Sequence, residues 1–153
     1  MGDTLRNARR TDLAALEIVR RQAIEAAFAD EFDRSTYADS VAMPSSELSG
    51  WIGDEEVAVL LLETAVTPVA FGAADRGAGI VLALYTAPDY WRRGYGSTVL
   101  AGLENELRTG NDEIVANVPV TAPGFFEANG YRVLAGVDGE EIPHVECRKC
   151  VDA

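Results

Sequence analysis

The residues best suited to chemistry lie in one short segment, where an apolar run leads into two arginines and two glycines. Arg92 and Arg93 offer positive charge and a guanidinium geometry that suits phosphate. Gly94 and Gly96 lack Cβ atoms, so an anion can approach their backbone closely. A helix that begins here leaves its first N–H groups without partners inside the helix, and its dipole favours negative charge. The segment therefore predicts an anion-binding loop.

Three known phosphate-binding loops compete for this segment. The nucleoside-triphosphate loop needs Gly-Lys-Ser/Thr, and the segment contains no lysine. The dinucleotide fingerprint needs a third glycine where this chain has Val99, and it belongs at the start of a strand–helix–strand unit. A third pattern, Q/R-x-x-G-x-G/A, fits residues 91–96 (WRRGYG) best, with Trp91 in place of the first Gln or Arg.

From Leu5 to Lys149 the chain resembles the GNAT-type N-acetyltransferases, in which the third pattern is the pyrophosphate loop. Residues 5–13 (LRNARRTDL) are similar to the family's first strand and helix, and residues 84–90 (LYTAPDY) to its approach to the loop. Residues 122–131 (APGFFEANGY) are similar to its A-x-x-F-Y-E-x-x-G-F segment. The resemblance implies direct transfer of an acetyl group from acetyl-CoA to a primary amine, in a ternary complex and without a metal.

The resemblance also assigns the cofactor contacts. In the family, the end of the strand before the loop pairs with the pantetheine arm like an added strand, and the loop N–H groups hold the pyrophosphate. The residues implied here are Leu84, Tyr85, Thr86, Arg92, Arg93, Gly94, Tyr95, Gly96, Ser97 and Phe126. The side chains of Trp91 and Tyr95 either pack beside the cofactor or cover the start of the helix.

The catalytic residues stay unassigned. The family usually protonates the leaving thiolate with the Tyr of F-Y-E, where this chain has Phe126, which cannot donate a proton. A thiol with a pKa of about 8.5 leaves without help, so turnover need not be lost. Tyr85 and Tyr131 are alternative acids. The absence of the usual acid also leaves open a non-catalytic acyl-CoA-binding module with the same fold.

The general base is equally open. Glu63, at a strand end, and Asp75, beside a turn, are candidates, although such carboxylates are usually only solvated. The family's frequent Asn before its last helix is absent, and Pro119 stands about there. The acidic residues 30–33 and 54–56 could attract a cationic amine, or could simply form solvated faces.

The histidine and the two cysteines are residue types that often bind metals, but here we expect them to have structural roles. His144 is the only histidine and lies beside a proline in an expected strand. Cys147 and Cys150 form C-x-x-C, but no second pair completes a zinc site. Residues three apart in a strand face opposite sides, so these cysteines should not lie together.

Apolar periodicity predicts the elements that hold the loop. Strands are expected at residues 4–9, 57–63, 68–74, 79–86, 114–118, 131–137 and 143–150. Helices are expected at residues 13–28, with Thr11 as N-cap, at 94–108 and at 122–128, and one or two short helices within 29–50. The order predicts a mixed α/β fold with an antiparallel meander at 57–86. The resemblance implies a twisted, mostly antiparallel sheet of about seven strands flanked by about four helices.

Composition limits the class of protein. A chain of 153 residues predicts a single domain, residues 1–153, and a hydrophobic content of 48% excludes a disordered chain. No apolar run reaches the roughly 18 residues of a membrane span, and residues 1–10 (MGDTLRNARR) lack the apolar core of a secretory signal. We expect a cytoplasmic protein that does not bind membranes.

The net charge of −12 argues against nucleic-acid partners, because an acidic surface repels phosphate backbones. Lys149 is the only lysine among thirteen basic residues. This balance fits a high-salt cytoplasm, or a GC-rich genome with a merely soluble surface. The remaining partner is an amine acceptor, a small molecule or a peptide, which the family selects with loops near 29–50 and 137–143. Homodimers are common in the family.

Overall fold

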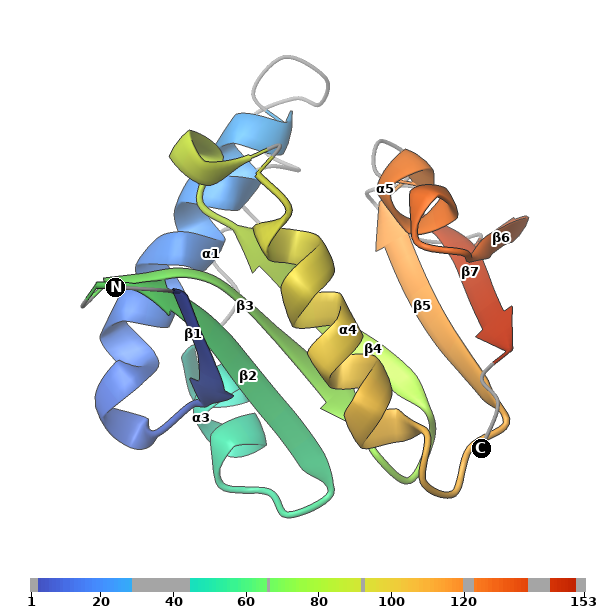
Figure 1. Cartoon of the computed structure of the whole chain (residues 1–153), viewed down its shortest axis with the longest axis horizontal. Coiled ribbons are helices and arrows are strands. Elements are labelled where there is room, and N and C mark those ends of the chain that lie inside the picture. Colours follow the sequence, from blue (N-terminus) through green and yellow to red (C-terminus); the bar gives the residue numbers. More distant parts are fainter. Residues whose placement is uncertain are drawn as a thin grey trace.

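The computed structural model describes residues 3–28, 45–65, 67–91, 93–119, 123–137 and 144–150. They form a seven-stranded sheet in the order β1-β2-β3-β4-β5-β7-β6 (Figure 1). The strands are β1 (Asp3–Asn7), β2 (Val57–Thr64), β3 (Thr67–Asp75), β4 (Ile80–Thr86), β5 (Glu113–Pro119), β6 (Arg132–Val137) and β7 (His144–Cys150). Neighbouring strands are antiparallel except β4 and β5, which are parallel.

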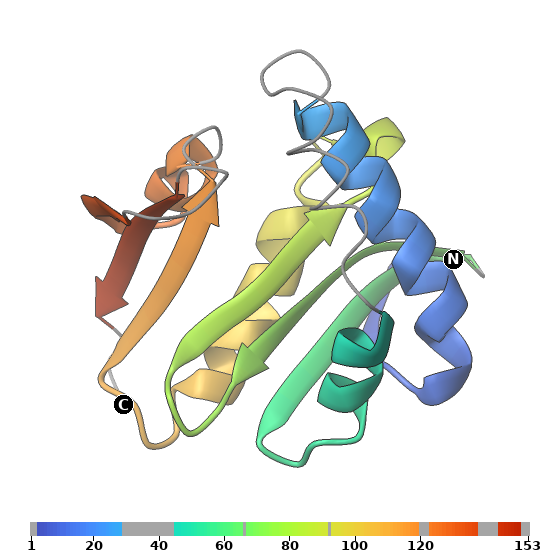
Figure 2. The same ribbon diagram turned by 180° about the vertical axis from the view of Figure 1, so that it is seen from behind.

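Helices cover both faces of the sheet (Figures 1 and 2). The described helices are α1 (Leu13–Phe28), α3 (Ser45–Ile52), α4 (Tyr95–Leu107) and α5 (Pro123–Ala128). Leu60 and Leu62 of β2 belong to the core cluster with α4, whereas Leu61 belongs to the cluster with α1 and α3. Because successive strand residues point to opposite faces, the continuous apolar run of β2 serves both clusters. No described helix has both the length and the apolar character to span a bilayer.

The predicted mixed α/β fold with a largely antiparallel sheet is confirmed, and so are the meander and the helix over residues 13–28. The remaining boundaries move by a few residues: the first strand ends at Asn7, and the helix after the loop begins at Tyr95. Arg92 and the acidic residues 30–33 lie outside the described residues.

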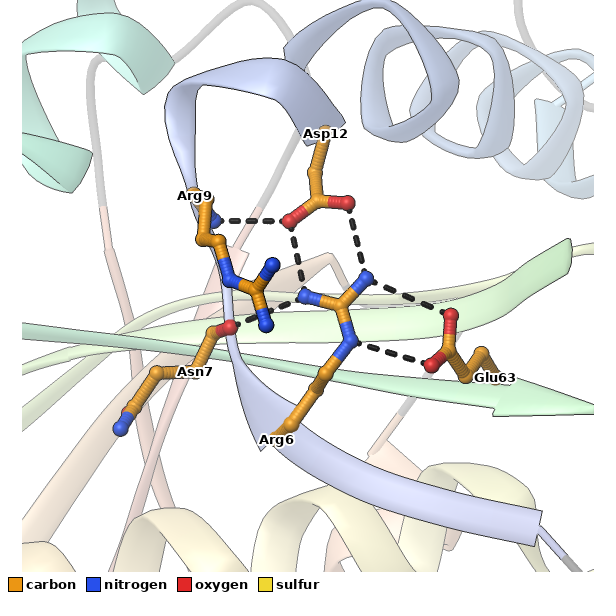
Figure 3. A network of polar contacts seen from close by, with 5 residues as sticks. All are labelled: Arg6, Asn7, Arg9, Asp12 and Glu63. Carbon is orange, nitrogen blue, oxygen red and sulfur yellow. Dashed lines mark hydrogen bonds and ion pairs between the residues drawn. The ribbon is translucent and has the colours of Figure 1, made fainter. Parts of the chain in front are cut away.

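The prediction of Thr11 as N-cap is wrong, because a short 3₁₀ turn, η1 (Arg10–Asp12), precedes α1. The carboxylate of Asp12 accepts the Arg9 N–H at 2.7 Å and two guanidinium N–H groups of Arg6 at 2.9 Å each (Figure 3). Arg6 also donates to Glu63 of β2 at 3.1 and 3.3 Å. The start of α1 is therefore attached to β1 and β2 by charge rather than by a hydroxyl cap.

The sheet opens between β4 and β5. Among the described residues these two strands pair only at Ile80–Val115 and Val81–Ala116, and beyond them the strands diverge (Figure 1). On the other edge of β4 the register with β3 shifts at the same place, which leaves Leu82 as an extra residue. A bulge of this kind bends its strand. The bend turns the rest of β4 away from β5 and leaves its edge unpaired.

Removing the Asp12 carboxylate should destabilise the protein in a pH-dependent way. The Arg6 guanidinium holds the pKa of Asp12 below its ordinary value of 3.8, so this stabilisation is complete above that value and is lost as pH falls through the lower folded-state pKa. We expect Asp12→Asn to lower the free energy of unfolding by about 1–3 kcal/mol near neutral pH, measured by urea denaturation. The difference from wild type should shrink towards about pH 2.

The exposed Asp112 supplies the control. Asp112→Asn should change the free energy of unfolding by less than about 0.5 kcal/mol at every pH. Equal losses in the two variants would contradict a special role of the Asp12 carboxylate.

Candidate functional site

The turn between β4 and α4 contains the predicted anion-binding loop. After a 3₁₀ turn, η2 (Pro88–Tyr90), the chain reaches Gly94, the N-cap of α4, with φ +83° and ψ 3°. A Cβ at Gly94 would meet no atom within 4 Å, so the left-handed backbone conformation, and not crowding, requires glycine here. The Gly94 carbonyl accepts both the N–H and the hydroxyl of Thr98 at 3.0 Å. Among the described residues, no side chain of the N-cap bonds the first N–H groups of α4, which have no partners within the helix.

Gly96 marks a close approach of three elements. A Cβ at Gly96 would lie 3.2 Å from Oγ1 of Thr86, at the end of β4, and 3.4 Å from the Phe125 ring on α5. A side chain at this position would therefore fill the space between α4, Thr86 and Phe125. The structure thus brings Thr86, Gly96 and Phe125 together.

Sequence reasoning missed Phe125 and chose its neighbour. Phe126 is 5% exposed and packs edge-on against Phe125 and Tyr131, with ring centroids at 5.2 and 5.3 Å. Phe125 is only partly buried and contacts the start of α4. In a six-residue helix, apolar periodicity is too short to decide which of two adjacent phenylalanines faces inwards. A contact of Phe126 with the cofactor stays a prediction.

One edge of β4 faces the opening, and beyond Val81 it pairs with no other described strand. The Ala87 N–H donates to the Val69 carbonyl of β3 at 2.8 Å. Because backbone groups of successive strand residues point to alternate edges, those of Leu84 and Thr86 face away from β3. The side chains of Leu84 and Tyr85 pack into the two core clusters on opposite faces of the sheet. The strand therefore offers main chain, not side chains, to a ligand in the opening.

Aromatic side chains line the loop. Trp91, 42% exposed, donates its indole N–H to the Thr86 carbonyl at 2.7 Å, which ties the loop to the strand end. The Arg93 guanidinium lies 5.5 Å from the centre of the Tyr90 ring, and that ring lies 6.0 Å from Tyr95. Tyr95 is partly buried against the core cluster of α4. Both side chains therefore pack around the start of α4, and a contact of either with the cofactor stays a prediction.

Of the two tyrosines considered as acids, Tyr131 is buried and Tyr85 is partly buried. The Tyr131 hydroxyl donates to Glu104 at 2.8 Å inside the core, and burial together with this bond raises the pKa of Tyr131 well above its usual value. Burial likewise raises the pKa of Tyr85, whose ring packs 5.5 Å from Phe71 on the face under α1. The Tyr131 proton already has an acceptor, which argues against its transfer to a thiolate.

The two carboxylates considered as bases have structural partners. Glu63 forms an ion pair with Arg6 at 3.1 Å (Figure 3). Asp75 Oδ1 accepts the N–H groups of Gly77 and Ala78 at 3.0 and 3.1 Å and so holds the turn between β3 and β4. Both carboxylates therefore serve the structure: Glu63 joins β2 to β1, and Asp75 holds a turn.

The two cysteines of the C-x-x-C pattern are both free. Cys147 is fully buried and Cys150 is exposed, which confirms that they lie on opposite sides of β7. Burial raises the pKa of the Cys147 thiol, so it stays protonated at neutral pH. In the described part of the chain, no three His, Cys, Asp or Glu side chains gather closely enough to hold a metal ion.

Comparison with known proteins agrees with this geometry. The sequence model of the acetyltransferase (GNAT) family matches residues 18–131. A GCN5-related N-acetyltransferase from Rhodopseudomonas palustris has a similar structure, with a TM-score of 0.85 and 22% identity over 99% of this chain and 97% of that one. The PaiA N-acetyltransferase from Thermoplasma acidophilum, solved with coenzyme A, has a TM-score of 0.85 and 21% identity over 99% and 100%.

A third similar structure is the ribosomal-protein-S18-alanine N-acetyltransferase from Escherichia coli, with a TM-score of 0.75 and 16% identity over 99% of this chain and 96% of that one. A search of curated proteins finds no match. At these identities the solved structures establish the fold, and the match of the family model establishes the family.

Two glycine substitutions should test the loop backbone, because they should change the free energy of unfolding in opposite directions. An added Cβ meets open space at both Gly94 and Gly50, but only Gly94 has a left-handed conformation. We expect Gly94→Ala to lower the free energy of unfolding by about 1–2 kcal/mol. Gly50→Ala, within α3, should raise it by up to about 1 kcal/mol. Urea denaturation measures both, and a stabilising Gly94→Ala would contradict the observed N-cap geometry.

Proposed function

The chain belongs to the acetyltransferase (GNAT) family, and from this premise we propose that it transfers an acetyl group from acetyl-CoA to a primary amine. The acceptor would be a small molecule or a peptide. One observation carries the proposal: the unpaired edge of β4 meets the glycine-rich start of α4 where the sheet opens. Anion-binding and strand-pairing groups thus border the same opening.

The residues present fit acetyl-CoA. The N–H groups of Tyr95, Gly96 and Ser97 at the start of α4, with the Arg93 guanidinium beside them, would hold the pyrophosphate. Arg92, outside the described residues, would add a second guanidinium. The backbone of Leu84 and Thr86 would bond the amides of the pantetheine arm. The Thr86 carbonyl already accepts the Trp91 indole, but a carbonyl oxygen has two lone pairs and can accept a second donor.

The proposed chemistry depends mainly on position. Bound acetyl-CoA supplies an activated thioester, and the protein brings an amine to it and offers backbone N–H groups to the developing oxyanion. Phe126 supplies no acid, and Glu63 and Asp75 are held in structural bonds. The amine would therefore react from its neutral fraction, and the thiolate would leave without a proton from these side chains.

Calorimetric titration with acetyl-CoA tests the proposal. We expect micromolar binding in dilute buffer or in molar KCl, and Gly96→Val should weaken it at least about tenfold. The reason is that the valine side chain would occupy the space between the helix start, Thr86 and Phe125. Gly50→Val, in open space on α3, should bind like wild type. An excess of ATP or NAD should not displace acetyl-CoA.

Release of free thiol with a panel of amines then tests turnover. Formation of CoA that depends on an added primary amine supports the transferase. Binding without turnover by any amine would favour a non-catalytic acyl-CoA-binding module, as the phenylalanine at position 126 allows. No binding at either salt concentration would overturn the proposal.

A further inference from the structure

The two halves of the molecule share little backbone pairing. The first half comprises β1–β4 with α1, α3 and α4, and the second comprises β5–β7 with α5 (Figure 1). In the sheet they are joined only by the two described residue pairs between β4 and β5. Two pairs at one end of diverging strands constrain the angle between the halves only weakly. The width of the opening must be set by contacts elsewhere.

A buried carboxylate of the first half binds two side chains of the second. Glu104 on α4 is 6% exposed. Its Oε2 accepts the Tyr131 hydroxyl at 2.8 Å, and both of its oxygens accept from Lys149 Nζ at 3.2 Å. Lys149 also donates to the Asn129 carbonyl at 2.9 Å, and its Nζ lies 5.6 Å from the Tyr131 ring centre. We call Glu104, Tyr131 and Lys149 the Glu104 clamp.

A second contact leads from the clamp to the loop. The Asn129 side chain donates to Ser97 Oγ at 3.3 Å and to the Phe125 carbonyl at 2.9 Å. Ser97 lies in the first turn of α4, among the predicted pyrophosphate contacts. Lys149 therefore holds the backbone of a residue whose side chain contacts the helix start. The second half therefore contacts α4 at two places along the helix, at Glu104 and at Ser97 in the first turn.

The ionic groups of the clamp are better suited to fixing the relative position of the two halves than to stabilising the fold. A buried ion pair loses much of its attraction to desolvation, and apolar side chains of similar volume are often as stable. Leu100, Leu103 and Leu107 surround Glu104 on the same helix and are fully buried, so an apolar residue would suit the site. Apolar contacts permit sliding, whereas these bonds of 2.8–3.2 Å fix both distance and direction.

We propose that the Glu104 clamp sets the width of the opening between β4 and β5, and that Glu104 is thereby a positioning residue for the pantetheine arm of CoA. The inference rests on the proposed cofactor function. Burial and the bond to Glu104 keep the Tyr131 hydroxyl protonated, so that it remains a donor in the clamp. Glu104 would act through Tyr131 and Lys149, which it holds, and not by contact with the cofactor or the acceptor.

Two ligands distinguish a loss of positioning of the pantetheine arm from a general loss of folded structure. CoA spans the loop and the opening, whereas 3′-phospho-ADP carries the same pyrophosphate without the pantetheine arm. In Glu104→Gln, which keeps the volume and removes the charge, we expect the Kd for CoA to rise about tenfold. The Kd for 3′-phospho-ADP should change by less than about twofold. Both are measured by calorimetry.

Glu106→Gln is the matched control. It makes the same chemical change two residues further along α4, where Glu106 forms an ion pair with Arg76 at 2.8 Å within the first half. It should leave both dissociation constants unchanged. Tyr131→Phe keeps the packed ring and removes only the hydroxyl, so it should repeat the selective loss of CoA affinity if Glu104→Gln does not fold.

The outcomes are distinct. Selective loss of CoA affinity in the clamp variants, absent from Glu106→Gln, supports the inference. Equal loss for both ligands, or loss for neither, would overturn it. Failure of the unaltered protein to bind CoA would overturn the proposed function, and this inference with it, before any variant is compared.

Discussion

The separation of β4 from β5 after two residue pairs is the constraint on which the rest of the site depends. An unpaired strand edge inside a sheet leaves backbone donors and acceptors that need partners. Here the Trp91 indole satisfies one of them, at the Thr86 carbonyl. Since α4 begins beside that edge, the same separation brings the free N–H groups of the helix to the opening.

An open sheet has to be held together by packing. The core cluster under α4 joins residues of β2 and β3 to Ile114, Phe126 and Cys147 of the second half. Non-directional apolar burial supplies most of the free energy of folding but does not specify the angle between the halves. Directional contacts, from Asn129 to Ser97 and within the Glu104 clamp, can specify it.

The net charge of the chain affects which ligands it attracts. A net charge of −12 opposes the approach of an anionic ligand and favours that of a cationic amine. Several basic side chains form ion pairs with acids: Arg6 with Asp12 and Glu63, Arg76 with Glu106, and Arg148 with Glu113 and Glu146. Arg93 lies instead over the ring of Tyr90, within the turn that leads to α4.

The sequence by itself determined the elements and the loop, because both depend on neighbouring residues. Apolar periodicity predicts α1 and the meander, and two glycines with two arginines predict an anion site in any fold that starts a helix there. Tertiary structure alone decided which of Phe125 and Phe126 faces the loop, and that Glu63 is bound to Arg6. It also decided the Glu104 clamp, whose partners lie 27 and 45 residues away along the chain. Such contacts depend on how the strands are ordered and how the helices pack, and no local pattern records them.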